Sequence, residues 1–88
     1  MLNTDKIIYD FLFEIFEKLG YLVKEVDFFD NELDGFGMSG RMFDKKLILL
    51  DSRSSYMVKN RFLIGELKKI DTENIFIYPI IRKLIEED

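Results

Sequence analysis

The reactive side chains of this 88-residue chain are carboxylates, amines, phenols and hydroxyls, because it contains no Cys and no His. Histidine changes charge near neutral pH and is the commonest metal ligand, and a cysteine thiolate is both a nucleophile and a metal ligand. Serine and cysteine triads, imidazole acid–base catalysis and zinc sites built on histidine or cysteine are therefore excluded. The sequence predicts no catalytic residue, no metal site and no cofactor, so we expect the chain not to be an enzyme.

One run of glycines has the spacing of a phosphate-binding loop. Residues 35–40 read Gly-Phe-Gly-Met-Ser-Gly, which matches G-x-G-x-x-G. A dinucleotide site places this motif between a strand and a helix, so that the helix N-terminus meets the pyrophosphate. Here a strand-like run follows the glycines. We therefore expect the glycines to loosen a hairpin and not to hold a nucleotide.

Acidic residues precede the glycines. Asp30, Glu32 and Asp34 imitate the first half of a calcium-binding loop, but Arg41 stands where that loop needs a bidentate Glu. Paired carboxylates could also serve a glycosidase, yet no apolar run beside them would raise the pKa of one member of the pair. We expect a solvated acidic turn, or an acidic patch that meets a basic partner.

Aromatic and methionine side chains crowd around the same segment. Interface cores favour these residue types, and a domain this small can bury only some of its nine Phe and four Tyr rings. We expect the cluster to contact a protein partner, with a homodimer as one form of that contact. The predicted binding residues are Phe28, Phe29, Phe36, Met38, Met42 and Phe43, with the acids Asp30, Glu32 and Asp34.

Charge is unevenly distributed along the chain. Residues 1–34 hold nine acids and three bases, residues 35–69 hold eight bases and three acids, and residues 70–88 hold five acids and two bases. The two signs can pair in the fold, or the central segment can form a basic face for an acidic protein or a nucleic acid. The sequence pI of about 4.8 argues against nucleic acid. That alternative face comprises Arg41, Lys45, Lys46, Arg53, Lys59 and Arg61.

Residues 19–70 resemble a known family in three runs. Residues 33–36 read Leu-Asp-Gly-Phe, residues 46–52 read Lys-Leu-Ile-Leu-Leu-Asp-Ser, and residues 60–70 read Asn-Arg-Phe-Leu-Ile-Gly-Glu-Leu-Lys-Lys-Ile. Together they resemble the ImmA/IrrE-like metallopeptidases, in which a strand-rich segment leads into a helix that carries Arg-Phe-Thr-(apolar)-Ala-His-Glu-Leu-Gly-His. Arg61 and Phe62 match the Arg-Phe pair, and Glu66 and Leu67 match the Glu-Leu pair.

The zinc motif of that family is not intact here. The family's H-E-x-x-H places two imidazoles one helical turn apart on one Zn²⁺, but this chain has Gly65 and Lys69 at those positions. Glycine offers no ligand and lysine would repel the metal. The resemblance therefore implies a metal-free, catalytically inactive domain in which Glu66 pairs with Lys69 or Lys59. Members of such families often act on a repressor or regulator of phages and mobile elements, so it also implies a protein partner.

A small α+β domain over residues 1–88 has to position these residues. Apolar periodicity predicts a helix over residues 4–19, capped by Asn3 or Thr4 and ended by Gly20, and a second helix that starts after Ser52, Ser54 or Ser55 and runs to about residue 70. Strands are expected over residues 21–28, 36–43, 46–50 and 74–78, and a last helix over residues 79–87. The expected order is α-β-β-β-α-β-α, with an antiparallel or mixed short sheet packed against helices.

These observations favour recognition over catalysis. We expect a non-enzymatic protein-binding module, a small phage or mobile-element regulator or inhibitor that occupies a site on a host protein. The alternatives are a nucleic-acid-binding regulator that uses the basic residues 41–69, and a catalytically dead ImmA/IrrE-like remnant. No apolar stretch approaches the roughly 18 residues that span a bilayer, so a cytoplasmic location is expected.

Overall fold

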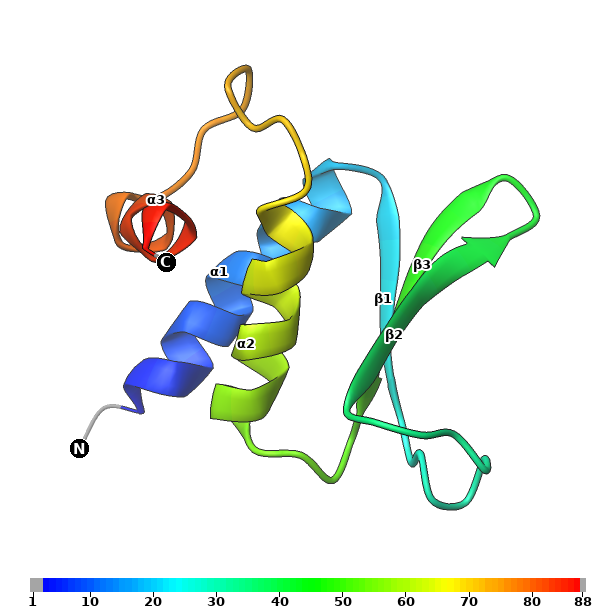
Figure 1. Cartoon of the computed structure of the whole chain (residues 1–88). Coiled ribbons are helices and arrows are strands. Elements are labelled where there is room, and N and C mark those ends of the chain that lie inside the picture. The colour runs from blue at the N-terminus through cyan, green and yellow to red at the C-terminus, as the bar shows by residue number, and fades with distance from the viewer. Residues whose placement is uncertain (1–2, 88) are drawn as a thin grey trace.

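A computed structural model describes residues 3–87, with three helices and a three-stranded sheet in the order α-β-β-β-α-α (Figure 1). The predicted α+β class is confirmed, and the sheet is mixed. The elements are α1 (Thr4–Lys18), β1 (Tyr21–Val26), β2 (Gly37–Met42), β3 (Lys45–Asp51), α2 (Tyr56–Leu67) and α3 (Pro79–Glu86). No helix within residues 3–87 combines the length and the apolar character needed to cross a bilayer.

Local signals set the helix ends. The Asn3 side chain accepts a hydrogen bond from the backbone N–H of Lys6, and the Ser55 hydroxyl accepts one from that of Val58. Each cap satisfies a donor that the first helical turn leaves free. After α1, Gly20 takes a positive φ of 88°, which costs glycine little and turns the chain into β1. Pro79 occupies the first turn of α3, where its missing N–H is not needed.

The sheet has β3 at its centre, and its order is β1-β3-β2. β1 pairs with β3 in parallel, with Val23 opposite Ile48, and β2 pairs with β3 in an antiparallel ladder, with Ser39 opposite Ile48. A tight turn at Phe43 and Asp44 joins β2 to β3, and the loop of residues 27–36 joins β1 to β2 at the opposite end of the sheet (Figure 1). The two ends of the sheet therefore carry different connections.

The core lies between one face of this sheet and the helices α1 and α2. Val23, Ile48 and Leu50 are buried there with side chains of both helices. The helix α3 packs on α1 and α2 on the side away from the sheet (Figure 1). Layering thus runs from α3 through the helix pair to the sheet, and the other face of the sheet carries no helix or strand of residues 3–87.

The expected strand over residues 74–78 does not form. Tyr78 has the extended backbone that the residue before a proline prefers, with φ −53° and ψ 139°, but the segment lies beside the helices and has no strand to pair with. Ile77 is buried in the core, and the Arg82 guanidinium donates to the Thr72 hydroxyl at 2.8 Å and to the Thr72 carbonyl at 3.3 Å. An extended conformation becomes a strand only where a ladder partner is available.

Candidate functional site

Side chains alternate along each strand, so the sheet has one face that packs on the helices and one that does not. The buried side chains Val23, Ile48 and Leu50, and the contact of Gly37 with Phe62 of α2, mark the face that meets the helices. Residues one position away in each strand must point to the other face. This outer sheet face comprises Leu22, Lys24 and Val26 of β1, Met38, Gly40 and Met42 of β2, and Lys45, Leu47, Leu49 and Asp51 of β3.

Apart from Lys24 and the two ends of β3, the outer sheet face is apolar, and no helix or strand of residues 3–87 covers it. The apolar run of β3 places Leu47 and Leu49 outward and Ile48 and Leu50 inward, a pattern typical of strands buried on both faces. Met38 and Met42 remain 40% and 47% exposed. Gly40 leaves a hollow of about 120 Å³ between Met38, Leu47 and Leu49. Of the residues on this face, the aromatic-and-methionine prediction found only the two methionines.

Three exposed phenylalanines lie at the two ends of the sheet. Phe43 is 94% exposed at the turn of the β2–β3 hairpin, and Phe29 and Phe36, 79% and 62% exposed, lie at the other end of the strands. Phe28 corrects the predicted patch, because its side chain is buried and its N–H donates to an Asp51 side-chain oxygen at 3.3 Å. The fold thus buries Phe28 and exposes Phe29, although the sequence analysis predicted both as binding residues.

The predicted acidic turn is a structured loop. Asp27 organises it by accepting the Asp30 N–H on its side chain and the Asn31 amide on its carbonyl. The carboxylates of Asp30, Glu32 and Asp34 are exposed, and no cation of residues 3–87 lies within 4.0 Å of them. A hollow of about 600 Å³ opens on this loop, lined by Phe28, Phe29, Asp30, Glu32, Leu33 and Asp34.

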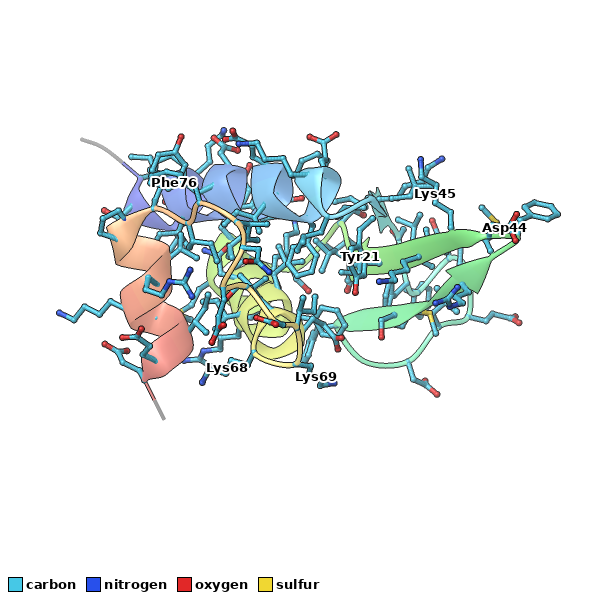
Figure 2. All side chains as sticks on the ribbon, turned by 90° about the horizontal axis from the view of Figure 1, so that it is seen from above. Tyr21, Asp44, Lys45, Lys68, Lys69 and Phe76 are labelled. Atoms are coloured by element: carbon cyan, nitrogen blue, oxygen red, sulfur yellow. The ribbon has the colours of Figure 1, made fainter. Side chains whose placement is uncertain are left out.

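The predicted basic residues do not form one face. Lys59 is buried, 5% exposed, and cannot meet a nucleic acid. Arg53 lies beside the acidic loop, 3.8 Å from Asp27. Lys45 and Lys46, with Arg41 opposite Lys46, begin β3 at the hairpin end of the sheet, and Figure 2 shows Lys45 and Asp44 at that end, away from the helices. Arg61 is exposed on α2 and lines a hollow of about 340 Å³ with Phe36 and Phe62.

A partly buried ionic cluster, which the sequence analysis missed, joins β1, α1 and α2. Glu25 of β1 accepts the Tyr9 hydroxyl of α1 and the Lys59 ammonium of α2, both at 2.7 Å. The same ammonium lies 5.1 Å from the ring centre of Tyr56 and 5.7 Å from that of Tyr9. A sequence signal existed, because Lys59 occupies the buried stripe of α2 together with Leu63 and Leu67.

Electrostatics in this cluster favour the charged carboxylate. Burial raises the pKa of Glu25, but the hydrogen bonds from Lys59 and Tyr9 and the Lys59 charge outweigh burial and hold that pKa below its usual range. Burial, followed by the hydrogen bond to Glu25, raises the pKa of the Tyr9 hydroxyl. Both Glu25 oxygens are hydrogen-bonded, so the cluster ties β1, α1 and α2 together.

The positions that resemble the metallopeptidases lie on α2. Glu66 contacts Lys69 at 3.3 Å, one of the two pairings that the resemblance implied, while Lys59 turns to Glu25. Within residues 3–87, no group of three or more acidic side chains is placed to hold a metal ion. The glycine run lies at the start of the antiparallel strand β2 and is followed by a hairpin and not by a helix.

Comparison with known proteins assigns no family. No family model matches the chain, and neither a curated protein nor a solved structure matches it significantly. The resemblance to the ImmA/IrrE-like metallopeptidases stays a prediction that rests on Arg61, Phe62, Glu66 and Leu67. Function is therefore argued from the geometry of the outer sheet face.

Proposed function

We propose that the chain is a non-enzymatic protein-binding module whose docking surface is the outer sheet face. One observation carries the proposal: the central strand β3 is apolar on both sides, and the helices cover only one of them. A strand with this composition is stable when both faces are covered. A protein partner would supply the missing layer.

The exposed side chains around this face are of the kind that carry binding energy. Full burial of one large apolar side chain contributes about 1.5–3 kcal/mol, so Met38, Met42 and Phe43, all at least 40% exposed, together contribute on the order of 4 kcal/mol. Association costs about 4–15 kcal/mol of lost freedom. Apolar burial alone therefore supports at most a weak complex, and the charged ends of the face have to add affinity.

The chemistry of the side chains supports a function without catalysis. The chain has neither imidazole nor thiol, the pKa of the Glu25 carboxyl lies below its usual range, and both Glu25 oxygens accept hydrogen bonds. A general acid at neutral pH needs a carboxyl whose pKa is raised. The finer assignment, a phage or mobile-element regulator or inhibitor that occupies a site on a host protein, is a proposal that rests on the family resemblance.

A matched pair of methionines tests the docking surface. Met42 on the outer sheet face and Met57 on α2 are each 47% exposed, so Met42→Lys and Met57→Lys place the same charge at equally exposed sites. The tagged chain is used as bait in a lysate of its native cells, and retained proteins are identified by mass spectrometry. We expect Met57→Lys to retain the proteins that the unaltered chain retains and Met42→Lys to lose them, with unchanged circular dichroism.

The proposal fails if both lysine variants retain the same proteins as the unaltered chain. It also fails if the Met57→Lys variant loses them while Met42→Lys keeps them, because the surface would then lie on α2. Met38→Lys, on the same strand as Met42, is a second variant for the case that Met42→Lys is poorly folded.

A further inference from the structure

We propose that the helix-facing side of the β2–β3 hairpin binds a phosphate monoester between Arg41 and Lys46. This site is separate from the proposed docking surface, because it lies on the opposite side of the sheet. Three features support it: a pair of like charges that face each other, a hollow that both side chains line, and the acidic character of the whole chain.

The strand register places the two cations directly opposite each other. Arg41 of β2 pairs with Lys46 of β3, and Tyr21 of β1 pairs with the same lysine. Lys46 lies two positions before the buried Ile48, so its side chain points to the helix-facing side, as does that of its partner Arg41. Opposite residues of an antiparallel pair have Cβ atoms about 4.5–5.5 Å apart, and like charges there are destabilising. An anion held between the two side chains would turn this repulsion into attraction.

No carboxylate of residues 3–87 neutralises the pair. Neither cation lies within 4.0 Å of an acidic oxygen in this part of the chain. Glu66 of α2 lines the same hollow, but its carboxylate lies 3.3 Å from the Lys69 ammonium. The Lys46 ammonium lies 5.3 Å from the ring centre of Tyr21, and this contact holds it at the wall of the hollow. Two positive charges thus stay available for an anion from outside.

The hollow has the size and the donors that a phosphate group needs. Its volume of about 310 Å³ falls within the range of small-molecule sites. Figure 2 shows Tyr21 between the helices and the hairpin turn at Asp44, where the hollow lies. The guanidinium presents paired N–H donors that match two phosphate oxygens, and the ammonium is a donor for the third. The lining residues are Tyr21, Ser39, Gly40, Arg41, Lys46 and Glu66.

A small dianion fits the charge of the chain better than a polyanion does. The formal net charge is −4 and the sequence pI is about 4.8, so an extended nucleic acid would be repelled outside the hollow. A phosphate monoester carries about −1.5 to −2 charges at pH 7 and places three acceptor oxygens on one atom. A carboxylate has a single charge for two cations. The phosphate monoester therefore matches the pair, as a free ester or on a phosphorylated side chain.

The neighbouring lysine provides a matched control. Lys45 and Lys46 are both exposed and have no ion pair within residues 3–87, but they point to opposite sides of the sheet. Lys45→Gln and Lys46→Gln therefore remove the same charge at adjacent positions. Methyl phosphate is titrated into the isotope-labelled chain at constant ionic strength, and the shifts of the backbone amide resonances give the dissociation constant.

We expect saturable shifts at residues 39–41 and 46, with a dissociation constant in the millimolar range. Binding should be about tenfold weaker in Arg41→Gln and in Lys46→Gln, because each change removes one charged donor. Lys45→Gln should bind as the unaltered chain does. Circular dichroism checks that the variants are folded. An unaltered chain without saturable shifts at millimolar methyl phosphate would overturn the site, as would equal weakening by Lys45→Gln and Lys46→Gln.

Glu66 tests the same hollow in the opposite direction. Its carboxylate is the one acidic side chain among the lining residues, so it repels a bound phosphate. Glu66→Gln should therefore strengthen the binding of methyl phosphate severalfold, a result that a loss of fold cannot imitate. Weaker binding in a folded Glu66→Gln variant would contradict the placement of the anion in this hollow.

Two further ligands identify the source of the phosphate. Dimethyl phosphate has one charge, as the nucleic-acid backbone has, and we expect it to bind at least about tenfold more weakly than methyl phosphate. A phosphoserine peptide that binds more tightly than methyl phosphate, and is weakened by Lys46→Gln, supports a phosphorylated protein; equal or weaker binding supports a small ester. A single-stranded oligonucleotide that binds through Arg41 while methyl phosphate does not bind would overturn the proposal in favour of nucleic acid.

Discussion

The burial of Lys59 and Glu25 differs although the two residues form one ion pair. The Lys59 side chain is 6% exposed, whereas that of Glu25 is 35% exposed and sits on an edge strand. A charge that loses its partner costs more free energy when it is more deeply buried. Removal of the carboxylate should therefore be more harmful than removal of the ammonium.

Two near-isosteric substitutions test this asymmetry. Glu25→Gln leaves the buried ammonium of Lys59 without a counter-charge, and we expect it to lower the free energy of unfolding by about 3 kcal/mol. Lys59→Met keeps an aliphatic stem between Tyr9 and Tyr56 and leaves a carboxylate that water can reach, so we expect a loss of about 1 kcal/mol. Urea denaturation measures both values. Equal losses, or a larger loss for Lys59→Met, would contradict the argument.

The pH dependence of stability provides a second test of the role of Glu25. The pKa of Glu25 in the folded chain lies below its ordinary value of 4.5, so the folded state binds the proton less readily than the unfolded state. The stabilisation is complete above the ordinary pKa and is lost as the pH falls through the lowered one. In the Glu25→Gln variant this part of the acid decline should be missing, and an unchanged decline would show that other carboxylates cause it.

Among the elements, the packing of α2 on β2 depends on a glycine. A Cβ atom at Gly37 would lie 2.6 Å from Cγ of Phe62 and 2.8 Å from both Cδ atoms, which is closer than carbon atoms approach. The glycine run therefore has three separate structural roles. Gly35 adopts a positive φ of 83° in the loop, Gly37 admits the Phe62 ring, and Gly40 leaves the hollow of the outer sheet face.

Gly37→Ala should displace the Phe62 ring and lower the free energy of unfolding by about 1–3 kcal/mol, the usual cost of overpacking. Gly40→Ala is the matched control on the same strand, because nothing lies within 4 Å of its added Cβ. Urea denaturation in parallel checks both variants. Restoration of stability in Gly37→Ala by a second change, Phe62→Leu, would show that the ring is the cause, and a Gly37→Ala variant as stable as the unaltered chain would refute the contact.

In the whole molecule, the sheet has helices on one face and no covering layer from residues 3–87 on the other. The Cα radius of gyration of the chain is 13.0 Å, whereas a compact domain of 88 residues has about 12 Å. The principal extents of 38, 36 and 22 Å describe a flattened body with the sheet on one side. The face without a covering layer is the outer sheet face.

The homodimer that the sequence analysis gave as one form of contact would make stability depend on protein concentration. Where the dimer predominates, mass action raises the thermal midpoint by about 4 °C for each tenfold rise in concentration, given the entropy of unfolding of two domains of this size. Calorimetry over a hundredfold concentration range measures the effect. Met42→Lys should abolish the dependence and Met57→Lys should retain it. A midpoint that is independent of concentration in the unaltered chain would count against self-association.

The sequence by itself determined the local elements. The caps at Asn3 and Ser55, the turn at Gly20 and the proline that opens α3 act on neighbouring residues, so their effects could be predicted from adjacent positions. Apolar periodicity placed three helices and three strands to within a few residues, and with them the α+β class. Of the apolar residues of the outer sheet face, the residue types indicated only Met38 and Met42, and the predicted aromatic and acidic binding residues stay a prediction.

Only the tertiary structure decided which of these residues face water. Phe28 and Phe29 are adjacent and identical, yet one is buried and the other is exposed, because the side of the strand or loop that meets the helices depends on distant parts of the chain. The same holds for Lys59, which is buried and pairs with Glu25 of another element, and for the extended residues near Tyr78, which have no strand beside them. Periodicity reports local preference, whereas burial and strand pairing require partners that only the folded chain brings together.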